Sequence, residues 1–212
     1  MAELDTLYQA VLTGDAKAAV AVTRQALDEG LDPLALIQGT TVPAMDEVGR
    51  RFEAQDYFVP ELLLSARAMK ASLDLLRPLL AGREAAFAGR VAIGTVQGDL
   101  HDIGKNLVAS MLEGGGFEVI DLGTDVPPQT FVDAIQHQGV QMVALSTLLT
   151  VTMGSMRQTI EALTAAGVRD RVKVMVGGAP VTQRYADQIG ADGYSENASA
   201  AVALARRLRG VA

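Results

Sequence analysis

The chain has 212 residues, a formal net charge of −7 and no cysteine, and these properties exclude several classes of protein. An acidic chain without clustered lysine and arginine is unsuited to nucleic acid, whose phosphates require a positive surface. Without cysteine there are no disulfides, thiolate-held metals or cysteine nucleophiles. The N-terminus lacks a basic and apolar leader, and no apolar run approaches the roughly 20 residues that span a bilayer. We therefore expect a cytoplasmic protein that contacts neither membrane nor nucleic acid.

The first half of the chain shows helical patterning only. Helices are expected at about 3–13, 15–29 and 33–52, and a fourth begins near Pro60. The apolar residues of the fourth helix are spaced by four and three positions and so form one stripe: Leu62, Ala66, Met69, Leu73, Leu76 and Leu80. Four helices with short loops predict a small antiparallel bundle in residues 1–85, followed by a linker at 81–89, where periodicity is weak.

From residue 86 onward, strand and helix patterns alternate. Short apolar runs, typical of strands buried on both faces, lie at 91–96, 118–122, 142–146, 172–176 and, more weakly, 192–194. Helices are expected after them, at about 103–113, 128–137, 153–166, 181–189 and 197–209. The alternation predicts an α/β fold, with a flavodoxin-like (Rossmann-type) doubly wound parallel five-stranded sheet in residues 86–212.

The unusual residues follow three of the expected strands. Residues 98–106 follow the first strand, 146–150 the third and 177–180 the fourth. In the flavodoxin-like order 2-1-3-4-5 these three strands are neighbours, and such sheets bind ligands outside the carboxyl ends of their strands. We therefore expect the three loops to meet in one site.

Several kinds of site compete for the first loop. A phosphate loop needs four residues between its first glycine and Gly-Lys, and then Ser or Thr; here five intervene and Asn106 follows Lys105. Asp99, His101 and Asp102 are too few ligands for a divalent metal site. A hydrolytic triad of Ser146, His101 and an aspartate lacks the Gly-x-Ser-x-Gly elbow.

The pair Asp99 and His101 favours a different chemistry. Two residues apart in an extended loop, they project to the same side. Asp99 can then accept the imidazole Nδ1–H, which leaves Nε2 free for a metal. One histidine suffices only where the metal arrives already held by a macrocycle. An isolated Asp-x-His is more often structural, so this interpretation depends on the other motifs.

Together, the motifs resemble a known family. Asp99-x-His101-x-x-Gly104, then Ser146-x-Leu148, then Gly177-Gly178 is similar to the cobalamin-binding domain of methionine synthase, corrinoid methyltransferase proteins and cobalamin mutases. The resemblance implies that His101 is the axial ligand to cobalt and displaces the cofactor's own dimethylbenzimidazole. It implies that the displaced nucleotide tail lies between the sheet and its flanking helices. The cofactor would be cobalamin, as methylcobalamin or cob(I)alamin, or a related corrinoid.

The resemblance also assigns roles to individual residues. It implies a relay from His101 through Asp99 to a hydroxyl six residues after Ser146, where the methionine synthase pattern has serine and this chain has Thr152. The full set of implied cofactor contacts is Gly98, Asp99, His101, Asp102, Ile103, Gly104, Ser146, Leu148, Thr150, Gly177, Gly178, Ala179, Ala198, Phe52 and Val59.

The N-terminal half narrows the resemblance to one branch. Residues 48–61 and 65–70 look like the helical cap of methionine synthase and of the small methanogen-type corrinoid proteins, which radical mutases lack. Phe52 and Val59 match apolar positions that shield the upper face of the corrin. Ordinary packing in the bundle core is an equally open interpretation of both residues.

The function implied is that of a corrinoid carrier, which is not an enzyme alone. The carrier would shuttle a methyl group between a substrate-specific methyltransferase and an acceptor methyltransferase that uses tetrahydrofolate or a thiol, with a reductive activase as a further partner. Two alternatives stay open: a cobalamin-binding sensor, and the cobalamin subunit of a radical mutase. A sensor needs an output module, and its bundle often carries a tryptophan, which this chain lacks.

Overall fold

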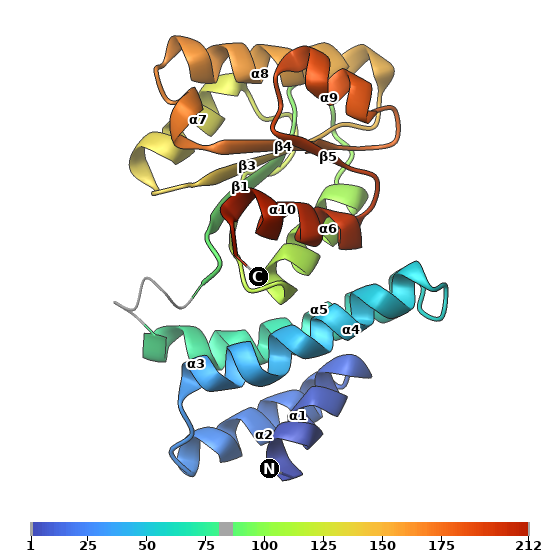
Figure 1. Ribbon diagram of the computed structural model, residues 1–212, viewed down its shortest axis with the longest axis vertical. Coiled ribbons are helices and arrows are strands. Elements are labelled where there is room, and N and C mark those ends of the chain that lie inside the picture. Colours follow the sequence, from blue (N-terminus) through green and yellow to red (C-terminus); the bar gives the residue numbers. More distant parts are fainter. Residues whose placement is uncertain (1, 81–86, 212) are drawn as a thin grey trace. The chain divides into compact units, whose positions relative to one another are not determined.

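The computed structural model describes residues 2–80 and 87–211, and the chain divides into two compact units. One unit comprises Met1–Phe87 with Glu113–Gly116, and the other comprises Ala88–Leu112 with Phe117–Ala212 (Figure 1). The domain boundary and most of the linker expected from the sequence fall on residues 81–86, outside the described residues. We describe each unit by itself.

The first unit is built from helices. Its elements are α1 (Ala2–Leu12), α2 (Ala16–Asp28), α3 (Pro33–Leu36), the π-helix η1 (Ile37–Thr41), α4 (Val42–Glu53), α5 (Val59–Leu76) and the 3-10 helix η2 (Arg77–Leu80). Asp15 caps α2 by accepting the N–H of Ala18, and Gly30 follows its end with a φ of +80°. The apolar stripe predicted on the fourth helix is buried throughout.

The third expected helix contains a π-helical turn. The helix runs through α3, η1 and α4 without a loop, so the prediction of one helix at 33–52 is close to the structure. Pro43 stands near the start of α4 and has no N–H to donate to the carbonyl of Gly39. The missing bond accounts for the wider turn directly before it.

The second unit is an α/β layered fold. Its strands are β1 (Arg90–Thr95), β2 (Glu118–Asp121), β3 (Met142–Ser146), β4 (Lys173–Gly177) and β5 (Gly193–Ser195). Its helices are α6 (Ile103–Gly114), α7 (Pro128–His137), η4 (Thr150–Thr152), α8 (Met153–Ala165), η5 (Arg169–Arg171), α9 (Gln183–Ile189) and α10 (Ala198–Arg209). All pairings are parallel and the order is β2-β1-β3-β4-β5, which confirms the predicted fold.

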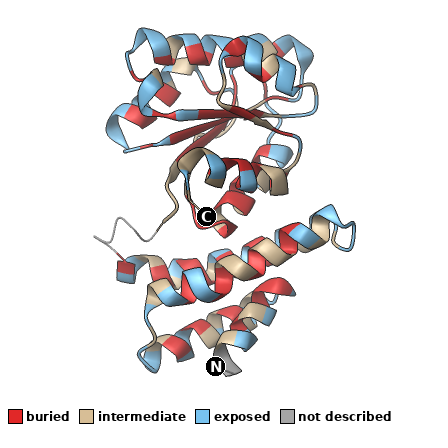
Figure 2. Cartoon of the chain, viewed as in Figure 1, coloured by how far each residue is buried: buried red, intermediate tan, exposed pale blue. Residues whose placement is uncertain are grey.

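Helices cover both faces of this sheet. In Figure 1, α7, α8 and α9 lie on one face, and α6 and α10 lie on the other. The central strands β1, β3 and β4 are largely red in Figure 2 because most of their residues are buried, as expected for a doubly covered parallel sheet. The edge strand β2 has no buried residue. Among the described residues, no helix is both long and apolar enough to span a membrane.

The strand register sets the place of the candidate site. Thr95 at the end of β1 pairs with Ser146 at the end of β3, and Ser146 pairs with Gly177 at the end of β4. Three strands therefore end level with one another. The loops that follow them start side by side, although the strand ends Thr95 and Gly177 lie 82 positions apart in the sequence.

Candidate functional site

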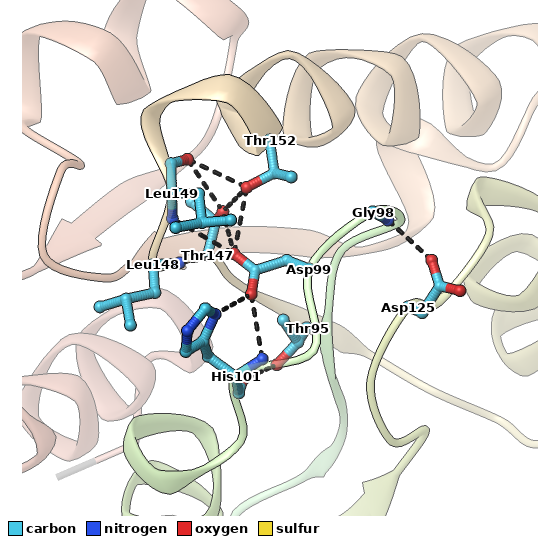
Figure 3. Close-up of polar contacts among 9 residues, drawn as sticks. All are labelled: Thr95, Gly98, Asp99, His101, Asp125, Thr147, Leu148, Leu149 and Thr152. Carbon is cyan, nitrogen blue, oxygen red and sulfur yellow. Dashed lines mark hydrogen bonds and ion pairs between the residues drawn. The ribbon is translucent and has the colours of Figure 1, made fainter.

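A buried carboxylate organises the loops at this edge of the sheet (Figure 3). Asp99, in the β1–α6 loop, is 0% exposed. Its Oδ1 accepts the backbone N–H of His101 at 3.0 Å and lies 2.7 Å from the ring Nδ1 of the same residue. Its Oδ2 accepts backbone N–H groups from Leu148 at 2.7 Å and Leu149 at 3.3 Å. One side chain thus joins the loops after β1 and β3.

Two hydroxyl groups complete the surroundings of Asp99. Thr147 Oγ1 lies 2.8 Å from Oδ2, and Thr152 Oγ1 lies 3.0 Å from the same atom. The structure therefore brings together the three residues of the predicted relay, His101, Asp99 and Thr152. Thr147 is an additional partner that the sequence did not single out.

The hydrogen bonds around Asp99 keep its carboxylate charged. Burial by itself raises the pKa of Asp99, but the backbone N–H groups of His101 and Leu148 lower it, and so do the His101 ring and the Thr147 hydroxyl. The net effect places this pKa well below its usual value. A carboxylate 2.7 Å from Nδ1 requires the proton on that nitrogen, which leaves the lone pair of the neutral ring on Nε2.

The backbone of His101 is fixed as firmly as its ring. Its carbonyl accepts the hydroxyl of Thr95 at 2.8 Å, and its N–H is bound by Asp99. Thr95 is itself buried at the end of β1. The imidazole is nevertheless half exposed, with 50% of the side chain accessible. The result is an oriented ring that presents Nε2 to an external ligand.

The loop that carries Asp99 and His101 is held from the β2–α7 segment. Asp125 accepts the N–H of Gly98 through Oδ1 at 2.7 Å, and its own N–H donates to the carbonyl of Asp99 at 2.9 Å. Asp125 has a φ of 53°, in the left-handed region, and Gly98 has a φ of +88°. Aspartate tolerates this region better than most residues do, so its side chain and its backbone can bind the loop together.

Exposed aliphatic side chains lie on the loops next to His101. Leu100, Ile103, Leu148 and Val151 are 74%, 82%, 45% and 84% exposed. Apolar side chains gathered at a sheet edge that binds ligands indicate a ligand with apolar faces. In residues 2–80 and 87–211, no three His, Cys, Asp or Glu residues are grouped to hold a metal ion. A metal bound by His101 would therefore need most of its ligands from elsewhere, as a corrin ring supplies them.

The other predicted contacts differ in position and in exposure. Asp102, Ile103 and Gly104 lie at the start of α6, and a Cβ on Gly104 would meet nothing within 4 Å. Ser146 is half-buried, Ala198 is buried at the first position of α10, and Thr150 and Ala179 are exposed.

The structure adds a reason for Gly178 that the sequence did not suggest. A Cβ there would lie 1.9 Å from the carbonyl oxygen of Thr147, and its φ is +127°. A Cβ on Gly177 would lie 3.2 Å from the carbonyl oxygen of Ser195. Gly178 is thus required by the protein's own packing, in addition to any approach by a ligand.

Phe52 and Val59 lie in the helical unit, near the ends of α4 and α5 that face one short turn. Val59 is 40% exposed and Phe52 is half-buried. Val59 is therefore not a residue of the bundle core, and core packing does not explain it. Its exposure is compatible with the shielding role that the resemblance implies, which stays a prediction.

Thr95, Thr147 and Asp125 are the residues that sequence reasoning missed. Threonine is common in strands, so Thr95 looked like an ordinary strand residue. Thr147 lay within the loop 146–150 but was given no role of its own. The signal that could have found Thr147 was its place directly after the third strand, beside the predicted ligand of the first loop. Asp125 gave a weaker signal, as a turn residue before two prolines.

Comparisons with known proteins show the family of the chain. Residues 89–203 match a family model described as a B12 binding domain, and residues 3–77 match a second model with the same description. The chain belongs to the B12-binding corrinoid proteins. It therefore binds cobalamin or a related corrinoid.

Relatives of similar length extend this result over the whole chain. The trimethylamine corrinoid protein of Methanosarcina barkeri is 47% identical over 92% of this chain and 91% of its own length. A corrinoid protein of Desulfitobacterium hafniense (strain Y51) is 40% identical over 99% of both. The crystal structure of a cobalamin-binding protein from D. hafniense DCB-2 matches with a TM-score of 0.78 and 37% identity, covering 96% of this chain and 97% of that one.

A solved complex also matches this corrinoid protein. The methanol:cobalamin methyltransferase complex of M. barkeri contains a chain that is 28% identical, with a TM-score of 0.87. The match covers 98% of the present chain and 80% of that one. Both units of the structure therefore have counterparts among corrinoid proteins.

Proposed function

We propose that this corrinoid protein is the methyl carrier of a multi-component methyltransferase system. It binds cobalamin base-off with His101 as the lower ligand, and it carries a methyl group between a substrate-specific methyltransferase and an acceptor methyltransferase. The observation that supports this most directly is the His101 ring, whose Nδ1 lies 2.7 Å from the buried Asp99 carboxylate while the ring stays half exposed. Such a ring is ready to bind a metal through Nε2 without rearrangement.

The residues at the site fit a corrinoid. A bound corrinoid supplies a cobalt centre that can accept and release a methyl group. His101 would hold this centre through Nε2, while the Asp99 carboxylate keeps a proton on Nδ1 and maintains the electron density of the ring. Leu100 and Ile103 offer exposed aliphatic surface to the macrocycle. Gly104, which has open space where a Cβ would point, leaves room for the nucleotide tail.

The relatives suggest which substrate-specific partner to test first. Named relatives include a trimethylamine corrinoid protein at 47% identity and a dimethylamine corrinoid protein at 44% identity. The chain in the methanol complex is 28% identical. We therefore propose a methylamine methyltransferase as the donor-side partner. An acceptor enzyme specific for a thiol or for tetrahydrofolate and a reductive activase complete the proposed system, and the cytoplasmic location stays a prediction.

The proposal is tested by following a labelled methyl group. The protein is loaded with hydroxocobalamin, reduced with titanium(III), and mixed with trimethylamine carrying a ¹³C methyl and with a trimethylamine methyltransferase; dimethylamine and methanol are tested with their own enzymes. We expect the label on the protein-bound corrinoid, and its release on addition of a thiol and an acceptor methyltransferase. Free hydroxocobalamin at the same concentration is the control. Absence of protein-bound label with all three donors would refute the carrier role.

A further inference from the structure

Thr147 is the least expected member of the buried network around Asp99. It follows Ser146 at the end of β3 and is 1% exposed. Its Oγ1 lies 2.8 Å from Asp99 Oδ2 and 2.6 Å from Thr152 Oγ1. Both threonine hydroxyls are thus within hydrogen-bonding distance of the same carboxylate oxygen and of each other.

Counting protons shows what the two hydroxyls can do. Each hydroxyl has one hydrogen to donate and can also accept. An O···O distance of 2.6 Å requires a hydrogen between the two oxygens. One threonine therefore donates to the other, and the second donates onward. The onward hydrogen can go to Asp99 Oδ2, which lies within 3.0 Å of both oxygens, or from Thr152 to the Leu149 carbonyl at 2.9 Å.

We propose that Thr147 and Thr152 are interchangeable positioning residues for His101, and that either hydroxyl alone can complete the Asp99 network. The backbone N–H groups of Leu148 and Leu149 hold Oδ2 from the same loop. A threonine hydroxyl and these backbone N–H groups together fix Oδ2. Oδ1 therefore stays directed at Nδ1 and at the N–H of His101. The sequence resemblance implies one hydroxyl in this chain of contacts, and the structure provides two.

The turn after β4 fixes the place of Thr147. The N–H of Thr147 donates to the carbonyl of Gly177 at 3.4 Å, and the Thr147 carbonyl occupies the space where a Cβ of Gly178 would lie. The two glycines therefore fix the backbone of Thr147, from which its hydroxyl reaches Asp99. In this arrangement they act on His101 through Thr147 and Asp99.

The test uses a double-mutant cycle in the full chain: Thr147→Val, Thr152→Val and the double variant. The inference rests on the proposed role of His101, so one readout is independent of the cofactor. In apo protein with ¹⁵N-labelled histidine, NMR reports the fraction of the His101 ring that carries its proton on Nδ1. In the cobalt(II) form, nitrogen hyperfine splitting reports the ratio of histidine-bound to histidine-free corrinoid at one fixed pH.

We expect each single variant to keep the Nδ1–H signal and to lower the histidine-bound ratio by about threefold or less, since the remaining hydroxyl takes over. The double variant leaves only the backbone N–H groups of Leu148 and Leu149 on Oδ2. It should lower the Nδ1–H fraction below that of either single variant and lower the histidine-bound ratio more than about tenfold, beyond the product of the singles. Thr147→Ser in the Thr152→Val background should restore the single-variant value. Thr164→Val is the control, because the hydroxyl of Thr164 donates to the Ile160 carbonyl of its own helix, away from Asp99.

Two results would overturn the inference. Either Thr147→Val has no effect even in the Thr152→Val background, or the effects of the two single variants multiply without excess. Alanine replaces valine in any variant whose circular dichroism shows that it has not folded. If the wild type retains no corrinoid, the proposed function fails, and the apo NMR measurement still decides the role of Thr147.

Discussion

The two units of the molecule present their candidate cofactor contacts in opposite ways. In the α/β unit, His101 is oriented by a carboxylate with 0% exposure and by backbone and hydroxyl groups from two loops. In the helical unit, the candidates are two apolar side chains that are not fully buried: Phe52 is half-buried and Val59 is 40% exposed. A metal ligand needs a fixed direction, whereas a shielding surface needs only apolar area.

This difference predicts different responses to mutation. Small isosteric changes in the α/β unit should disturb folding, because they leave buried donors without acceptors. Changes to the exposed apolar residues of the helical unit should leave folding intact and act on the bound cofactor.

The largest effect is expected from Asp99→Asn. The amide keeps the shape but places an NH₂ group against donors from His101 or Leu148, so the free energy of unfolding should fall by about 2–4 kcal/mol. Urea unfolding of the apo protein, followed by circular dichroism, measures this. Asp133→Asn, at an exposed position of α7 where Asp133 accepts the side-chain amide of Gln129, should change stability by less than about 0.5 kcal/mol.

Acid should reduce the difference between the wild type and Asp99→Asn. The pKa of Asp99 is lowered in the folded state, so the unfolded chain, with a pKa of about 3.9, takes up the proton first as the pH falls. The stabilisation is therefore present above about pH 4 and is lost as the pH falls toward the folded pKa. A gap between the two proteins that stays constant from pH 7 down to 3 would contradict the assignment.

The next largest effect is expected from Gly178→Ala. The added Cβ would lie 1.9 Å from the Thr147 carbonyl oxygen on a backbone with φ +127°, so the loop must move. We expect a loss of about 2 kcal/mol in the free energy of unfolding. Gly154→Ala is the control: it lies in α8 with nothing within 4 Å, and alanine there should be neutral or stabilising. Equal stability of the two variants would refute the packing role of Gly178.

Gly104→Ala separates a structural role from a cofactor role. Its Cβ would meet nothing within 4 Å, so the apo protein should be as stable as the wild type or up to about 1 kcal/mol more stable. If the nucleotide tail passes here, hydroxocobalamin affinity measured by equilibrium dialysis should fall by about tenfold. Unchanged affinity would place the tail elsewhere.

The smallest effect on stability is expected from Val59→Ala. Because Val59 is 40% exposed, its truncation should lower the free energy of unfolding by less than about 1 kcal/mol. If it shields the upper face of the cofactor, photolysis of protein-bound methylcobalamin should become severalfold faster. Leu79→Ala, at a side chain that is 55% exposed in η2, is the matched control. Equal photolysis rates would remove Val59 from the shielding surface.

The sequence predicts the fold and the location of the site at one edge of the sheet, and the reasons can be identified. Continuous apolar runs mark buried parallel strands, and the order of the strands then places the residues after β1, β3 and β4 at one edge. The two-residue spacing of Asp99 and His101 predicts their contact. Thr147 could have been suspected from its place directly after the third strand. The contributions of Thr95 and Asp125 could not be predicted, because they depend on how the β1–α6 loop folds in three dimensions.

The most direct test of the account is the visible spectrum and nitrogen hyperfine splitting of the reconstituted protein beside His101→Ala. The purified chain is incubated with hydroxocobalamin, desalted and reduced to cobalt(II). The account predicts stoichiometric retention by the wild type and a single-nitrogen splitting from histidine, which is lost in the variant. A folded wild type without the histidine splitting, or a His101→Ala variant that keeps that splitting, would contradict the assignment of His101 as the ligand.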